Sequence, residues 1–322
     1  MKFSVIIPLY NKAPYVSKAI ESVLSQTYPN FELVVMDDGS KDESFEVARK
    51  AIHGNNRCHL YKQKNAGVSM ARNNAVALSQ GDYLCFLDAD DWWSPDFLME
   101  LSRLIKEFPD AGIYGTSYTI VNETKHKTRV SPIGVESGFE RGYINYCQVY
   151  AKTMAMPLTS ISVAIPRNVF DEMKGFPKGV KLGEDFMLWI HIALKYKVAF
   201  LNKPLAYYNQ DVDFTNRGVG HLYPPQEHML WNLSDLEPLE KTNVDYKKLI
   251  DKLRDKSMLG YYIVPQYYTL AKEELAKVDW DDKGLKHARL YRFPRLIVKW
   301  FVDARTKGAR LKRIIINNYY KL

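Results

Sequence analysis

The chain carries the sequence YLCFLDADD at residues 83–91, in which a short apolar run leads directly into three carboxylates. The apolar half is typical of a buried strand, and Asp88, Asp90 and Asp91 follow at its carboxyl end. Clustered carboxylates repel one another, and a divalent cation with oxygen ligands relieves that repulsion. One interpretation of this segment is therefore a metal site at the end of a strand, although an Asp-x-Asp pattern alone is common. The alternative is that Asp90 or Asp91 only caps the helix expected after Pro95.

Two other apolar segments lead into polar residues in the same way. Residues 3–7, FSVII, lead to Tyr10, and residues 31–36, FELVVM, lead to the acidic pair at 37–38. Strands that alternate with helices predict a doubly wound, mostly parallel α/β sheet, whose ligands bind beyond the carboxyl ends of the strands. The expected strands cover residues 3–7, 31–36, 59–62, 83–87, 112–121 and 160–165, and the expected helices cover 16–24, 44–51, 69–79, 95–107 and 183–196.

The charge of the chain is unevenly distributed. Its 322 residues include 45 Lys and Arg against 37 Asp and Glu, a formal net charge of +8. Residues 283–322 hold 12 basic residues and one acid, whereas the preceding residues hold 33 basic and 36 acidic ones. We expect an α/β domain over 1–230, a helical extension over 231–282 and a basic tail over 283–322. Residues 122–157 show little periodicity, so we expect a long insert or flexible lid there.

Other classes of protein are excluded by composition. Cys58, Cys85 and Cys147 are widely spaced, which argues against a disulfide framework and a zinc site. No run of about 20 apolar residues is present to span a bilayer, and the first residues lack the apolar stretch of a signal peptide. The sequence therefore predicts a cytoplasmic location.

Several motifs in a fixed order point to one family. They are SVIIPLYN at 4–11, SVLSQTY at 22–28, FELVVMDDGS at 31–40, NAGVSMARN at 65–73, GDYLCFLDADD at 81–91, and GED at 183–185 followed by Leu188 and Trp189. In this order they resemble the inverting family-2 glycosyltransferases of the GT-A fold, of the kind that builds bacterial surface polysaccharides. The resemblance covers roughly residues 3 to 210. It implies a nucleotide-sugar half at about 1–115 and an acceptor half at about 116–230.

The resemblance implies an activity and a nucleotide site. A hexose would move from a nucleotide-diphosphate sugar, with UDP favoured, to a hydroxyl of a polysaccharide or lipid-linked oligosaccharide, assisted by Mn²⁺ or Mg²⁺. Asp38 would accept a hydrogen bond from the uracil N–H, and Pro8 and Tyr10 would line the same pocket. The alternative is that Asp38 only shapes its loop. Arg72 would pair with the diphosphate or hold the carboxylates of the acidic motif.

The same resemblance assigns roles to the acidic residues. Asp88 would face the ribose or the sugar, and Asp90 would bind the metal directly. Asp185 would be the general base that takes the proton of the acceptor hydroxyl as its oxygen attacks the anomeric carbon. Glu184 competes for that role. Alternatively, both residues only complement the dipole at the start of a helix.

Some positions depart from the family or have ambiguous roles. The family often has a basic residue after the Leu-Trp of its late motif, whereas Ile190 and His191 follow here, and we expect His191 to be structural. His221 is a second candidate metal ligand. Trp92 and Trp93 would either stack on a sugar face or anchor the following helix in the core.

The basic tail predicts a contact with a membrane. Leu296, Ile297, Trp300, Phe301 and Ala304 form an apolar stripe flanked by basic residues, a pattern that can lie in an anionic membrane surface. The alternative is a helix that packs this stripe on the protein body. We expect an enzyme held peripherally on the inner face of the cell membrane. Nucleic acid is not expected as a partner, because no recognised binding motif accompanies the charge.

Two other functions stay open from the sequence. A nucleotidyltransferase also uses a doubly wound sheet and metal-binding aspartates, but a glycine-rich phosphate loop after the first strand is absent. A non-catalytic protein that senses nucleotide sugars, or a membrane-bound scaffold, would need no general base.

Overall fold

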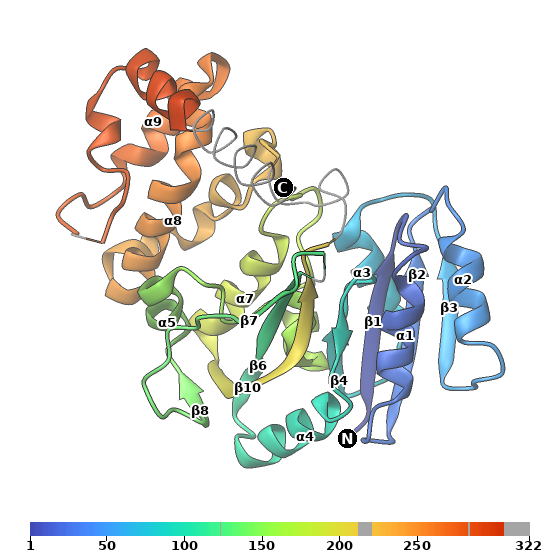
Figure 1. Ribbon diagram of the computed structural model, residues 1–322. Helices are drawn as coiled ribbons and strands as arrows, with labels where there is room; N and C mark the ends of the chain where they lie inside the picture. The colour runs from blue at the N-terminus through green and yellow to red at the C-terminus, as the bar shows by residue number, and fades with distance from the viewer. Residues whose placement is uncertain (123, 212–220, 283, 306–322) are drawn as a thin grey trace, which may run out of the picture. The chain divides into compact units, whose positions relative to one another are not determined.

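The computed structural model describes residues 1–122, 124–211, 221–282 and 284–305 (Figure 1). Its contacts divide the chain into two compact units, Met1–Glu237 and Pro238–Leu322. The finer division predicted from the sequence, with halves inside the first unit and a separate basic tail, stays a prediction.

The first unit is built on a ten-stranded sheet in the order β3-β2-β1-β4-β9-β6-β10-β5, with β7 paired to β6 and β8 paired to β10. Strands β1, β2, β3, β4, β6 and β10 run in one direction, and β9 lies antiparallel between β4 and β6. The predicted α/β fold with a mostly parallel sheet is therefore confirmed. The strands are β1 (Phe3–Leu9), β2 (Phe31–Asp37), β3 (Cys58–Lys62), β4 (Tyr83–Phe86), β5 (Trp92–Trp93), β6 (Ala111–Asn122), β7 (Lys127–Val130), β8 (Arg141–Ile144), β9 (Val163–Pro166) and β10 (Lys197–Asn209).

The register brings three loops to one edge of the sheet. Leu9 at the end of β1 pairs with Asp37 at the end of β2, and Ile6 of β1 pairs with Phe86 at the end of β4. The polar segments that follow these strands therefore leave the sheet at its carboxyl edge, where ligands of such sheets bind.

Helices cover both faces of the sheet. The first unit contains α1 (Val16–Leu24), α2 (Ser44–Ala51), α3 (Val68–Ala77), α4 (Phe97–Glu107), α5 (Tyr146–Thr153), α6 (Arg167–Glu172) and α7 (Glu184–Lys195). Apolar residues of α1, α2 and α4 form one buried cluster with alternate residues of β1 and β2. On the opposite face α3 packs against β1 and β2, and Phe86 of β4 contacts Phe170 of α6 and Phe176. The period of two along β1 explains this division, because alternate side chains point to opposite faces.

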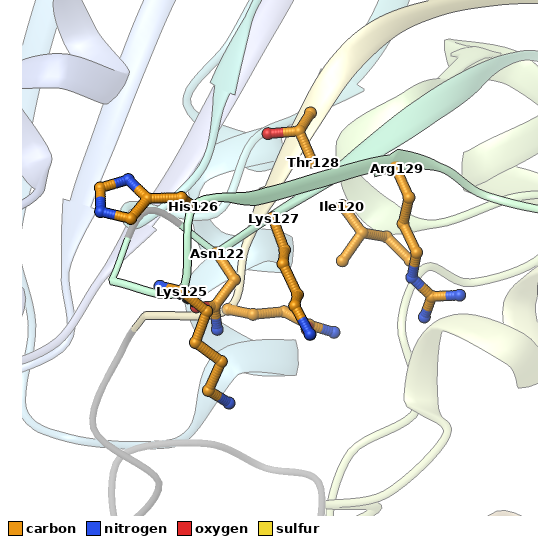
Figure 2. A pocket seen from close by; sticks show the side chains of 8 residues that line it. Ile120, Asn122, Lys125, His126, Lys127, Thr128 and Arg129 are labelled. Atoms are coloured by element: carbon orange, nitrogen blue, oxygen red, sulfur yellow. Dashed lines mark hydrogen bonds between the residues drawn. The ribbon is translucent and has the colours of Figure 1, made fainter. Parts of the chain in front are cut away.

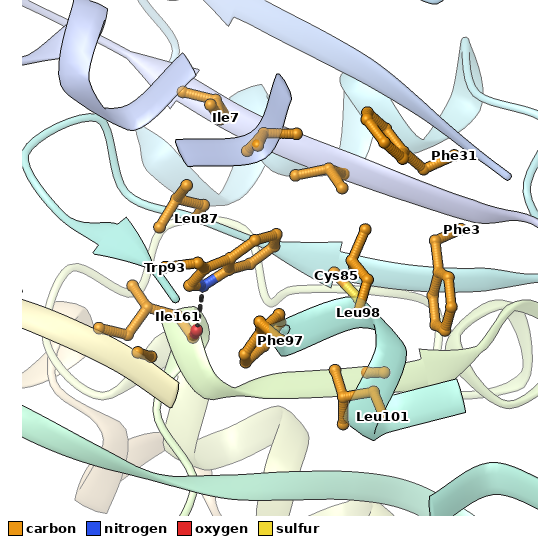
Figure 3. Close-up of a cluster of buried hydrophobic side chains, with 14 of the residues drawn as sticks. Phe3, Ile7, Phe31, Cys85, Leu87, Trp93, Phe97, Leu98, Leu101 and Ile161 are labelled. Carbon is orange, nitrogen blue, oxygen red and sulfur yellow. Dashed lines mark hydrogen bonds between the residues drawn. The ribbon is translucent and has the colours of Figure 1, made fainter. Parts of the chain in front are cut away.

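Trp93 is a core residue, as Figure 3 shows. Its ring stacks on Phe97 with the centroids 4.1 Å apart, and its indole N–H donates to the backbone oxygen of Ile161 at 2.7 Å. A tryptophan held in this way cannot stack on a sugar, so that role is wrong for Trp93. Trp92 stacks on Tyr207 of β10 with centroids 5.5 Å apart, and the Lys18 ammonium lies 3.2 Å from the centre of its ring.

The segment expected to be a long insert or lid contains regular structure. Within residues 122–157 the structure has β7, β8 and α5, which the sequence did not predict, and the role of the segment as an insert or lid stays a prediction. Every side chain of β7 is exposed. A strand with no buried face shows no apolar alternation, which is the signal that sequence analysis depends on.

The second unit is helical, with α8 (Val244–Ile263), α9 (Tyr268–Ala276) and a further helix over residues 295–305. Its core includes buried charges: Arg254 donates to both oxygens of Glu240 at 2.7 Å and to Glu274 at 3.1 Å.

Short 3₁₀ helices occur in both units. They cover Ser160–Ser162, Pro225–Glu227, Met229–Asn232, Ser234–Lys241, Pro265–Tyr267 and Leu290–Arg292.

The described part of the basic tail exposes its apolar stripe. In the helix over residues 295–305, Leu296 is 68% exposed and Trp300 is 65% exposed, whereas Val298 is buried. Residues 283 and 306–322 of the predicted tail lie outside the described residues. No helix in the described ranges has the length and apolar character that crossing a bilayer requires.

Candidate active site

Arg72 joins two of the acidic motifs at the carboxyl edge of the sheet. It lies on α3 and is only 3% exposed. Its Nη2 donates to Asp88 at 2.7 Å, and its Nη1 donates to Glu184 at 3.1 Å. Its guanidinium carbon also lies 5.0 Å from the centre of the Phe176 ring. Of the two roles expected for Arg72, the structure therefore shows a contact with a carboxylate of the acidic motif.

Gly183 positions the late acidic motif. It has φ +84° immediately before α7, and a Cβ atom at this position would collide with the Met229 side chain. A residue with a side chain would meet both that collision and the strain of a positive φ. Glycine thus lets the chain turn so that Glu184 and Asp185 form the first turn of α7.

Glu184 and Asp185 have different surroundings. Burial, followed by the charge of Asp185, raises the pKa of Glu184 to about 7, although Arg72 acts in the opposite direction. Burial also raises the pKa of Asp185, again against the influence of Arg72. Glu184 is engaged by Arg72, whereas no side chain among the described residues hydrogen-bonds to Asp185, whose Oδ1 accepts only the Phe186 N–H. Asp185 is thus the better placed of the two to accept a proton from a substrate.

Lys12 pairs with Asp90, and sequence analysis gave Lys12 no role. Its Nζ lies 2.7 Å from Asp90 Oδ2, with 14% of the lysine side chain and 18% of the aspartate side chain exposed. The Lys12 backbone N–H also donates to Ser44 at 2.7 Å. Lys12 could have been considered from the sequence, because it lies in the loop after β1. Loops at the carboxyl ends of parallel strands are where ligands bind, and Tyr10 was predicted to lie there for this reason.

Asp91 holds the acidic loop to β10. It is buried, and its Oδ1 accepts the backbone N–H of Asn209 at 2.7 Å. Burial, together with Asp90 and Asp88, raises the pKa of Asp91 well above its usual value. The structure therefore gives Asp91 a positioning contact with the end of β10.

Asp38 braces the loop that leads into α3. Its Oδ1 accepts from the Gln63 amide at 2.7 Å and from the Ala66 N–H at 2.8 Å, and its Oδ2 accepts the Gly67 N–H at 2.9 Å. These contacts match the expectation that Asp38 shapes its loop. Among the described donors only the Gly67 N–H bonds to Oδ2, so this oxygen has a lone pair for a nucleotide base.

Pro8 and Tyr10 lie at the same edge. Pro8 is in β1 and pairs in register with Met36 of β2, and Tyr10 follows the strand with its side chain 41% exposed. The Asn11 N–H donates to Ser40 at 3.1 Å, which ties the loop after β1 to the loop after β2. An exposed aromatic ring beside Asp38's loop offers a surface on which a base can stack.

The acidic loop offers oxygen atoms to a cation. No three His, Cys, Asp or Glu side chains converge on a metal-binding point in the described ranges. Hard cations commonly use one or two carboxylates together with substrate phosphates, so such a cluster is not required. Burial and the charge of Asp88 raise the pKa of Asp90, although Lys12 opposes them. Carboxylate oxygens are ligands that Mg²⁺ and Mn²⁺ prefer, and in this structure Lys12 and Arg72 pair with two of these carboxylates.

Three histidines of the first unit differ in their burial and contacts. His191 contacts the Met187 carbonyl oxygen at 2.6 Å and Asp235 at 2.8 Å, which agrees with the expected structural role. His221 is exposed, and its ring centre is 6.1 Å from that of Tyr223. His228, which sequence analysis did not single out, is buried, and burial lowers its pKa to about 4.

An α/β sheet that gathers an arginine and several carboxylates at its carboxyl edge is typical of proteins that bind a ligand at that edge. Staphylococcus aureus TarS 1–349 in complex with UDP-GlcNAc has the same fold, with a TM-score of 0.70 over 90% of this chain and 88% of that one, at 19% identity. The fold is therefore GT-A. The sequence profile of glycosyl transferase family 2 matches residues 4–170, just over half of the chain. The chain belongs to glycosyl transferase family 2, a family of enzymes.

Curated relatives carry the same family name. The glycosyltransferase GlyA of Streptococcus pneumoniae serotype 4 is 34% identical over 264 residues, which are 78% of this chain and 37% of the relative. An uncharacterized glycosyltransferase of Rickettsia felis is 36% identical over 205 residues, 64% of this chain and 32% of the relative. The chain thus spans about a third of the length of these relatives.

Proposed function

We propose that this protein is a metal-dependent inverting glycosyltransferase. It moves a hexose from a nucleotide-diphosphate sugar to a hydroxyl of a polysaccharide or of a lipid-linked oligosaccharide. The observation that carries this proposal is the position of Arg72, which joins Asp88 of the acidic loop to Glu184 beside Asp185. UDP is favoured as the nucleotide, because TarS, which shares the fold, is known in complexes with UDP-GlcNAc and with UDP.

The nucleotide-sugar binds at the loops after β1, β2 and β4 in this proposal. The base stacks on Tyr10, beside Pro8, and donates its N–H to the Oδ2 of Asp38. Asp88 faces the ribose or the sugar, and Arg72 keeps that carboxylate in place through the hydrogen bond at 2.7 Å. The ordered loops reduce the entropy lost when the donor binds.

Asp185 is the general base in this proposal. It accepts the proton of the acceptor hydroxyl, whose oxygen attacks the anomeric carbon on the face opposite the departing diphosphate. A carboxylate suffices if it lies within about 2.6–3.2 Å of that hydroxyl. The neighbouring Glu184 is less suited, since Arg72 already engages it.

Asp90 is the proposed metal ligand. A bound Mn²⁺ or Mg²⁺ would neutralise the negative charge that develops on the leaving diphosphate. His221 stays a second candidate for the same ion. Lys12 would have to share Asp90 with the ion, since its ammonium lies 2.7 Å from that carboxylate.

Three measurements test the enzyme proposal. Titration calorimetry should show Mn²⁺-dependent binding of UDP, and a screen of UDP-, dTDP- and GDP-sugars should show release of the nucleoside diphosphate. D185N should keep UDP binding and lose transfer, whereas D171N, at an exposed position on α6, should keep both. NMR of the product should show an inverted anomeric centre.

The alternatives predict other results. Pyrophosphate released from UTP in the presence of a sugar phosphate would favour a nucleotidyltransferase. A sensor or scaffold would keep its effect in cells when Asp185 is replaced by Asn. Absence of binding to any nucleoside diphosphate in the presence of Mn²⁺ would contradict the glycosyltransferase proposal.

We also propose a peripheral contact with the inner face of the cell membrane. The support comes from the exposed stripe of the tail helix, in which Leu296, Trp300 and Phe301 are exposed. Arg295, Lys299 and Arg305 flank this stripe, a combination that suits an anionic surface. Sedimentation with anionic vesicles should be lost when Leu296 and Trp300 are both replaced by Ser. Equal sedimentation of this variant would contradict the contact.

A further inference from the structure

A hollow with a basic lining lies at the β6–β7 hairpin. The register pairs Ile120 with Arg129 and Asn122 with Lys127, so these four side chains share one face of the hairpin. Figure 2 shows Lys127 and Arg129 extending to one side of the ribbon together with Lys125 from the turn. The hollow has a volume of about 490 Å³, and we refer to it as the basic hollow.

The cations of the basic hollow have no partner of opposite charge among the residues that the structure describes. Lys125, Lys127 and Arg129 form no ion pair with any described residue, and none of the described lining residues is Asp or Glu. Asp211, which follows Gln210, accepts the backbone N–H of Thr124 at 3.2 Å. Three cations on one short hairpin repel one another, and an anionic ligand would relieve this repulsion.

The basic hollow adjoins the acidic loop of the candidate active site. Gln210, which lines it, donates its backbone N–H to the Val121 carbonyl oxygen at 2.7 Å. The preceding residue, Asn209, donates its backbone N–H to Asp91 at 2.7 Å. A residue that lines the hollow is therefore the direct neighbour in the chain of a residue that hydrogen-bonds to the acidic motif.

We propose that the basic hollow binds an anionic group, a carboxylate or a phosphate, of the saccharide acceptor. This inference rests on the proposed function and names the class of its acceptor as an acidic saccharide. The carboxylates around Asp90 repel such a group, whereas the hollow attracts it. A neutral hydroxyl elsewhere on the same acceptor is then directed toward the acidic motif, so charge alone orients the substrate.

The polar lining favours a saccharide over other polyanions. Asn122 and Gln210 contribute side-chain amides, which can hydrogen-bond to sugar hydroxyls as well as to the anionic group. An anionic membrane would instead be met by exposed apolar side chains interleaved with the cations. Nucleic-acid binding without sequence preference adds aromatic side chains on which bases stack, and the described lining residues include no Phe, Tyr or Trp.

The first experiment compares charge variants of the full chain. Calorimetry measures binding of three probes: an oligogalacturonate, an oligomer of glycerol phosphate, and the neutral maltohexaose. K125Q/K127Q/R129Q should weaken binding of at least one anionic probe roughly tenfold or more, because each exposed ion pair contributes a severalfold factor. K125R/K127R/R129K keeps the charges and should retain that binding.

A matched control removes three exposed cations elsewhere in the first unit. K50Q/K106Q/K178Q changes the net charge by the same amount and should bind the anionic probe as the unmodified chain does. An equal loss in this control would assign the effect to net charge and overturn the proposal. Equal binding of maltohexaose and the anionic probes by the unmodified chain would overturn it too.

Other polyanions and the donor provide the remaining arms. Tighter binding of anionic vesicles or of a single-stranded oligonucleotide, lost in K125Q/K127Q/R129Q, would overturn the proposal in favour of those partners. UDP binding in the presence of Mn²⁺ tests the proposed function separately. A chain that binds the anionic saccharide and not UDP contradicts the proposed function, whereas one that binds UDP and none of the anionic saccharides contradicts the role of the basic hollow.

Discussion

The ammonium of Lys12 lies 2.7 Å from the carboxylate of Asp90, so the loop after β1 carries the counter-charge of the acidic loop after β4. The two residues are 78 positions apart, and the parallel register of β1 and β4 brings them together. A divalent cation at Asp90 would have to compete with this ammonium or share the carboxylate with it.

Replacement of Lys12 by Met should destabilise the protein and increase the stabilisation that it gains from Mn²⁺. The substitution leaves the largely buried Asp90 without its cation, at a cost of about 1–3 kcal/mol in the free energy of unfolding. Mn²⁺ should then raise the melting temperature of K12M by more than that of the unmodified chain. K50Q, on the exposed side of α2, serves as the control. An equal response of K12M and the unmodified chain to Mn²⁺ would argue against Asp90 as the metal ligand.

Replacement of Arg72 by Met should be among the most destabilising changes at the site. It leaves Asp88 and Glu184 without their shared cation, and removal of one partner from a buried ion pair typically costs about 3–5 kcal/mol. R72K keeps a charge but not the two-armed geometry, so its stability should lie between those of R72M and the unmodified chain.

The matched control for Arg72 is an exposed ion pair. Arg49 pairs with Glu46 on the surface of α2, with 59% of the arginine side chain exposed, and R49M should cost less than about 1 kcal/mol. Urea unfolding measures all three variants. A loss in R72M no greater than that in R49M would contradict the structural importance of the Arg72 bridge.

The stability of the protein should depend on pH through Glu184. Its pKa in the folded protein is raised to about 7 from 4.5, so the folded state holds this proton more tightly than the unfolded state does. The resulting stabilisation is complete below pH 4.5 and is lost as the pH rises through about 7, with a total on the order of 3 kcal/mol. E184Q cannot lose this proton, so its stability relative to the unmodified chain should increase from pH 5 to pH 8. Urea unfolding at both pH values measures this, with E46Q as the control. A difference that does not change with pH would contradict the raised pKa.

The sequence predicted the elements with strong apolar periodicity. Strands β1, β2 and β4 are apolar runs with buried faces, and the amphipathic helix α1 buries one face, so period and burial agree. β7 was missed because all its side chains are exposed. The antiparallel direction of β9 was also missed, because direction depends on partners far away in the chain.

The sequence predicted which residues lie at the candidate site, but it did not predict which of them contact one another. The strand-end rule placed Tyr10, Asp38 and Asp88 at one edge, and their register confirms that edge. The bond between Arg72 and Glu184 spans 112 positions, and no local pattern encodes it. The role of Lys12 was missed for the same reason.

Gly183 and Met229 should show a measurable coupling. Alanine at Gly183 would have φ +84° and a Cβ atom that collides with the Met229 side chain, so G183A should lose about 1 kcal/mol or more from strain and a further amount from the collision. M229A creates a cavity and should cost about 2–5 kcal/mol by itself. The double variant removes the collision but keeps the backbone strain, so its loss should be smaller than the sum of the two single losses. Urea unfolding of the four proteins gives the coupling energy, and UDP binding reports whether the start of α7 has shifted. Strictly additive losses would show that the Met229 side chain moves aside freely, and Gly183 would then be required only for its backbone conformation.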